Sequence, residues 1–90
     1  MRTSSVVDEP EFDGQAVILR VVVEDPDVGE EGGVFVCRMT GYDDVAVESF
    51  PLGNTPSSDA ESRVDAAAAA RRYALENREQ FDALFASLPG

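Results

Sequence analysis

One segment restricts the possible folds of this chain more than any other. Ala16 to Glu24 reads AVILRVVVE, a run dominated by β-branched side chains. It is too short for a typical helix and rich in the residues that strands favour, so we predict a β-strand. Alternation along this strand places four apolar side chains on one face, namely Val17, Leu19, Val21 and Val23.

Two further strands are expected downstream. The acidic, glycine-rich stretch Asp25 to Gly33 predicts a hairpin loop, and Val34 to Thr40 predicts a second strand. A turn at residues 41–44 then leads to a third strand, Val45 to Phe50, which Pro51 ends because proline has no amide to donate. The face of the second strand expected to enter the core carries Phe35, Cys37 and Met39.

The last third of the chain predicts helix. Ser58 and Glu61 have capping-box spacing, and the alanine run 66–70 favours helix strongly. Helical periodicity puts one apolar stripe on Val64, Ala67, Ala68, Ala74 and Leu75. A second apolar stripe, rotated by about 100° from the first, is expected at Phe81, Leu84, Phe85 and Leu88. We therefore expect either a bend near residues 76–78, with Asn77 capping a second helix, or a second packing partner.

Together these elements predict an α+β fold. We expect a three-stranded antiparallel meander followed by one long or broken C-terminal helix packed on one face. Residues 1–15 are expected to form a flexible acidic arm or a weak edge strand, with Asp13-Gly14 as a turn that could start a hairpin. Residues 16–90 are expected to form a single domain.

Charge is the most informative global property. The chain has 18 acidic and 7 basic residues, a net charge of −11, and every basic residue is arginine. This composition resembles that of haloarchaeal proteins, in which carboxylates keep the surface hydrated in concentrated salt. The single cysteine fits a reducing interior, and the absence of an apolar run long enough to span a bilayer argues against a membrane protein. We expect a cytoplasmic protein.

The residue types argue against an enzyme. The chain lacks histidine and lysine, which removes the commonest general base, the imidazole metal ligand and any Schiff-base lysine. Cys37 lies in an apolar strand and is expected to be a buried structural thiol. The acidic loop at residues 25–31 lacks the spacing of a calcium-binding EF-hand. We therefore expect no catalytic residue, no metal and no cofactor.

Two groups of residues are candidates for binding a partner. Arg63, Arg71 and Arg78 are expected on one flank of the helix, where they could hold an anion or a partner carboxylate, or pair within the chain. Phe81, Leu84, Phe85 and Leu88 could form core, or could bind a second copy or another protein. Protein interaction, including a homodimer, is the preferred function.

One family offers an alternative. The order of strands, the segment GGVFVCRMTGY and the turn Gly53-Asn54-Thr55 before a helix resemble the β-β-β-α unit of HicB-type antitoxin domains. The resemblance implies a regulatory, nucleic-acid-associated role, although the chain lacks the fourth strand and the appended DNA-binding segment of that family. The element order is also similar to the end of double-stranded-RNA-binding domains, but the helix start SDAESR is not basic, which argues against RNA binding.

The charge balance predicts a fold that depends on salt. Molar salt shortens the Debye length to about 3 Å and screens the repulsion among the carboxylates. We expect circular dichroism to show loss of folded structure when the protein is dialysed from about 2 M to about 0.1 M KCl. Unchanged stability would contradict the halophilic interpretation.

Overall fold

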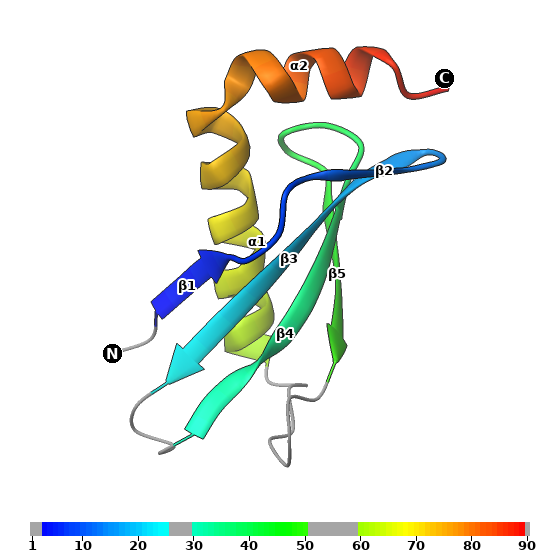
Figure 1. The fold of residues 1–90 in the computed structure, drawn as a ribbon. Helices are drawn as coiled ribbons and strands as arrows, with labels where there is room; N and C mark the ends of the chain where they lie inside the picture. Colours follow the sequence, from blue (N-terminus) through cyan, green and yellow to red (C-terminus); the bar gives the residue numbers. More distant parts are fainter. Residues whose placement is uncertain (1–2, 26–29, 51–59, 90) are drawn as a thin grey trace.

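The computed structural model describes residues 3–25, 30–50 and 60–89 and shows an α+β fold (Figure 1). The elements in chain order are β1 (Thr3–Val6), β2 (Glu11–Asp13), β3 (Ala16–Asp25), β4 (Glu30–Met39), β5 (Val45–Phe50), α1 (Ala60–Glu76) and α2 (Arg78–Ala86). An antiparallel sheet followed by C-terminal helices was expected and is confirmed. The number of elements differs from the expectation, since within these ranges the sheet has five strands and there are two helices.

The two additional strands come from the N-terminal segment. Both β1 and β2 pair with β3, so the sheet order is β1-β3-β4-β5 with β2 beside the other half of β3. A two-residue turn joins β2 to β3, and its Gly14 has a φ of 60°, which glycine adopts without strain. Of the two alternatives for residues 1–15, the structure shows edge strands over residues 3–6 and 11–13. The ten-residue β3 is long enough to pair with both.

The hairpin between β3 and β4 is longer than expected. Pairing continues through Glu24 with Glu31 and Asp25 with Glu30, after a register shift between Val23 and Glu24. The predicted loop at 25–33 was therefore too long, because backbone hydrogen bonds can extend a ladder past the last apolar side chain. The strand Val45–Phe50 is confirmed, and it pairs antiparallel with β4.

The core lies between one face of the sheet and the helices. The predicted core faces of β3 and β4 are confirmed, since all seven side chains are fully buried. Val45 and Val47 of β5 and Val6 of β1 pack against them from the sides. The helices complete the core with Ala66, Ala69, Ala70, Ala74 and Phe81.

The predicted stripe on α1 was wrong. Of its members only Ala74 is fully buried, while Val64 and Leu75 are exposed. The five consecutive alanines point to all sides of the helix, so helical periodicity does not determine which side faces the sheet. The helix turns its alanine side inward because small side chains allow close approach to the large residues of β3 and β4. This places the two larger aliphatic side chains outside.

The expected break in the helix is present. α1 ends at Glu76 and α2 begins at Arg78, and Figure 1 shows α2 crossing the end of the sheet at a steep angle to α1. Asn77 does not cap α2 as we expected. Its side-chain Nδ2 donates to the Tyr73 carbonyl at 2.9 Å, and its backbone N–H donates to the same carbonyl at 3.1 Å. Asn77 therefore satisfies the C-terminus of α1.

Two predicted features lie outside the described residues. They are the turn Gly53-Asn54-Thr55 and the Ser58 half of the capping box.

The contact between α1 and the sheet can be tested with a matched pair of substitutions. Ala70 is fully buried and Ala68 is exposed, so Ala70→Leu overpacks the core whereas Ala68→Leu does not. We expect Ala70→Leu to lower the free energy of unfolding by about 1–3 kcal/mol. Ala68→Leu should leave the free energy of unfolding nearly unchanged, because the new side chain is exposed and leucine has a helix propensity close to that of alanine. Urea denaturation in concentrated salt, with protein dilute enough to be monomeric, measures both, and equal effects would contradict this orientation of α1.

Candidate interaction surfaces

Cys37 is the only thiol, and it lies in the core. Its side chain is fully buried, and Sγ donates weakly to the Ala66 carbonyl at 3.6 Å. Burial raises the pKa of this thiol to about 11, so the nucleophilic thiolate is scarce at neutral pH. Within the described ranges, no three His, Cys, Asp or Glu side chains come together in a way that could hold a metal ion. No helix in those ranges is long and apolar enough to cross a membrane.

The apolar face of α2 is turned toward the core. Phe81 is fully buried and leaves no surface for a partner, while Leu84 and Phe85 are half-buried and pack against the core cluster. The Phe81 ring meets Tyr73 edge-on at a centroid distance of 6.0 Å, and the Phe85 ring meets Tyr42 edge-on at 5.1 Å. The first contact attaches α2 to α1, and the second attaches it to the turn between β4 and β5.

Tyr42, between β4 and β5, fixes α2 from the outside. Its hydroxyl donates to Asp82 Oδ1 at 2.6 Å and lies 3.2 Å from the Arg78 carbonyl. Burial and the neighbouring Asp82 carboxylate raise the pKa of this hydroxyl, and the Arg78 charge opposes them. Of the predicted C-terminal partner-binding residues, Leu88 is half-buried and lies at the far end of α2, near Gln15 and Thr40.

The three predicted arginines do not act as one cluster. Arg63 donates from Nη2 to the Val47 carbonyl on β5 at 2.8 Å. Arg78 lies 3.8 Å from Asp82 and 5.9 Å from the centre of the Tyr42 ring. Arg71 is exposed. All three are exposed, but two of them are engaged within the chain, and only Arg71 has no hydrogen bond or ion pair among the described residues.

On the face of the sheet opposite the helices, the two arginines are also paired within the chain. Arg20 forms an ion pair with Asp8 at 3.3 Å, and Arg38 forms one with Glu48 at 2.8 Å. Both pairs are largely exposed and contribute little to stability. The aliphatic side chains between them are half-buried.

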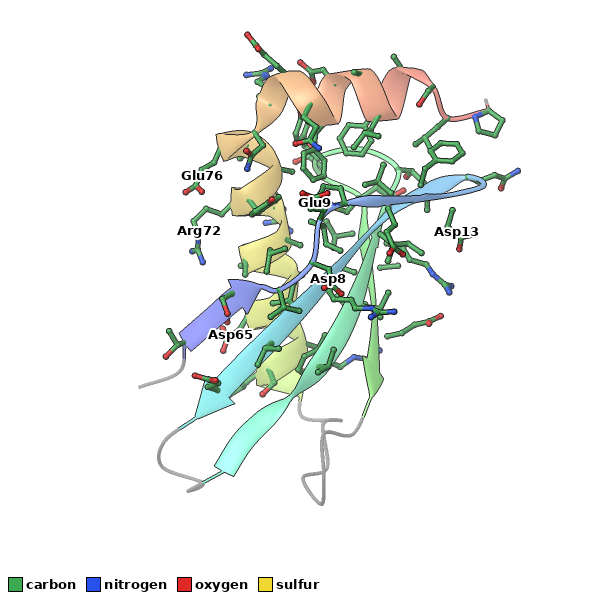
Figure 2. The ribbon with its side chains drawn as sticks, viewed as in Figure 1. Asp8, Glu9, Asp13, Asp65, Arg72 and Glu76 are labelled. Atoms are coloured by element: carbon green, nitrogen blue, oxygen red, sulfur yellow. The ribbon has the colours of Figure 1, made fainter. Side chains whose placement is uncertain are left out.

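The outer face of α1, opposite its alanine side, is different. Val64 is 68% exposed and Leu75 is 50% exposed, and the exposed Ala68 lies between them. Arg71 and Arg72 are exposed on the same outer half of the helix, and neither has a hydrogen bond or ion pair within the part of the chain that is described. Figure 2 shows Asp65, Arg72 and Glu76 along one side of the helix. We call Val64, Ala68, Arg71, Arg72 and Leu75 the α1 outer face.

This helix also differs in charge from the rest of the molecule. Residues 60–76 contain three acidic residues and three arginines, so α1 is electrically neutral. The remaining 73 residues therefore carry the whole net charge of −11. Sequence reasoning missed this surface because it assigned Val64, Ala68 and Leu75 to the core. The neutrality of residues 60–76 is the sequence signal that could have indicated it.

Comparison with protein-family models, curated proteins and solved structures finds no match.

The buried thiol predicts a specific dependence of stability on pH. In the unfolded chain Cys37 loses its proton near pH 9, whereas in the folded protein it retains the proton to about pH 11. The unfolded state then binds fewer protons, so the free energy of unfolding falls between these values, by at most about 1.4 kcal/mol per pH unit. Below pH 9 this contribution is constant.

Urea titrations of the wild type and of Cys37→Ala measure the effect. The difference between the two stabilities should shrink as the pH rises from 9 to 11. Parallel curves would contradict a buried, protonated thiol.

Proposed function

We propose that this chain is a non-enzymatic protein-interaction module that associates with itself through the α1 outer face. The observation that carries the proposal is the exposure of Val64 and Leu75 on a neutral helix of a strongly acidic chain. Single exposed aliphatic residues are common on protein surfaces. Here two of them share one side of a helix with an alanine between them and, beside them, two arginines that pair with no other residue in the described ranges.

Electrostatics favours this face over the others. Two copies with a charge of −11 each repel strongly unless salt screens them or their contact surface is locally neutral. α1 has as many arginines as carboxylates, so a second copy can approach the exposed side of this helix with little repulsion. We propose a cytoplasm rich in salt as the setting, since the same charges then keep the rest of the surface hydrated.

The proposed interface differs from the one expected at Phe81 to Leu88. That segment contributes Phe81 to the core, and Leu84 and Phe85 are half-covered by contacts within the chain. Less apolar surface remains there for a partner. A nucleic-acid-associated role receives no support from the arginines either, because Arg63 and Arg78 are already engaged.

The proposal is tested by light scattering after size exclusion in about 2 M KCl, where charge repulsion is screened. The wild type should change from monomer to dimer between about 10 μM and about 1 mM, because a face one helix wide is smaller than a standard interface. Leu75→Asp should be monomeric throughout this range with an unchanged circular dichroism spectrum, because Leu75 is half-exposed.

Phe12→Asp is the matched control. Phe12 is 49% exposed on β2, so this substitution removes a similarly exposed apolar side chain and adds the same charge at a different surface. It should dimerise as the wild type does. A monomeric wild type at every concentration, or equal loss of dimer in both variants, would refute self-association through α1.

A further inference from the structure

The spacing of the exposed aliphatic residues suggests how two copies pair. Val64 and Leu75 are eleven positions apart, about three helical turns, so they lie on the same side of α1. The midpoint between them falls between Ala69 and Ala70. A two-fold axis beside the outer face, perpendicular to α1 at the level of this midpoint, would make the second helix antiparallel and place Val64 of each copy opposite Leu75 of the other. Each exposed aliphatic side chain would then be covered by its counterpart.

We infer that the partner of the α1 outer face is a second copy of this chain, docked with its α1 antiparallel, and that Arg71 and Arg72 determine this orientation. The inference rests on the proposed function and adds to it the orientation of the two helices and the residues that select it.

The charges along α1 distinguish the two possible directions. Glu61, Arg63 and Asp65 precede the alanine run, and their charges sum to −1. Arg71, Arg72 and Glu76 follow it, and their charges sum to +1. In an antiparallel pair the acidic half of one helix lies beside the basic half of the other. In a parallel pair, Arg71 and Arg72 of both copies would meet at one level and repel each other. Charge complementarity therefore favours the antiparallel pair.

The positions of Asp65 and Arg72 on α1 indicate one ion pair between the two copies. Asp65 and Arg72 lie along the same side of α1 (Figure 2). A two-fold axis perpendicular to both helices brings these equivalent sides together. Arg72 of one copy then lies about 3 Å along the helix axis from Asp65 of the other, within reach of its long side chain. Asp65 also interacts within its own chain, so its carboxylate would be shared between the two contacts. The symmetry repeats this ion pair.

Ala68, which lies between Val64 and Leu75, leaves space for Arg71 of the other copy. In the antiparallel pair Ala68 of each copy lies opposite Arg71 of the other. A small residue there lets the helix axes approach to about 8 Å, and the aliphatic stem of Arg71 covers apolar surface while its guanidinium reaches water.

Disulfide cross-linking tests the orientation. Val64→Cys and Leu75→Cys are made separately, mixed in about 2 M KCl where the dimer is expected, and treated with a mild oxidant. We expect the mixed disulfide between the two variants to form at least tenfold faster than either homodimer disulfide. The wild type is the control for Cys37, which is fully buried and should give no cross-link. Denaturing gel electrophoresis with differently tagged variants distinguishes the three products.

The outcomes separate this inference from the proposed function. Homodimer disulfides without the mixed product, in a protein that light scattering shows to be dimeric, would overturn the antiparallel orientation and leave self-association intact. A dimer with no cross-link at all would place the interface elsewhere and overturn both, as would a monomer in light scattering.

Charge reversal tests the role of Arg72. Arg72→Glu should raise the dimer dissociation constant about tenfold or more at moderate salt, since it replaces two attractive contacts with two repulsive ones. Arg20→Glu, which changes the net charge equally on the outer face of the sheet, is the control and should have a smaller effect. Equal effects of the two variants would show that only net charge matters and would overturn a specific role for Arg72.

Discussion

The contact between the alanine side of α1 and the sheet is the interaction on which the rest of the structure depends. β3 and β4 present seven buried side chains, several of them large, and only small residues let a helix lie close above them. Ala66, Ala69, Ala70 and Ala74 meet this requirement. Because these alanines occupy the inner side, Val64 and Leu75 lie outside. The close packing of the core and the apolar surface of the molecule therefore have the same cause.

The second helix completes the core where α1 cannot reach. The break at Asn77 redirects the chain across the end of the sheet, and Phe81 enters the core from there. Tyr42 holds this helix through its ring contact with Phe85 and its hydrogen bond to Asp82. The apolar residues of the C-terminus are thus mostly used within the chain, which leaves α1 as the helix with apolar side chains facing solvent.

The strong acidity limits how the molecule can meet others. Acidic residues outnumber basic ones by 18 to 7, and Arg20 and Arg38 on the sheet's outer face are already in ion pairs. A contact surface on such a molecule must supply its own positive charge. α1 does so with Arg71 and Arg72, at positions where they face solvent.

The sequence by itself determined the α+β class, the three main strands, the inward faces of β3 and β4 and the break near Asn77. Each of these depends on local patterns, namely the alternation of β-branched residues and the change of helical stripe. Only the tertiary structure decided that residues 3–6 and 11–13 pair with β3, because their few apolar side chains carry no strand pattern and backbone hydrogen bonds hold them there.

Tertiary structure also decided the orientation of α1. Alanines on every side of the helix make its periodicity uninformative, and the larger residues Val64 and Leu75 suggested the opposite side. Their exposure follows from the space available above the sheet, which depends on the side chains of two other strands and cannot be read from the helix alone.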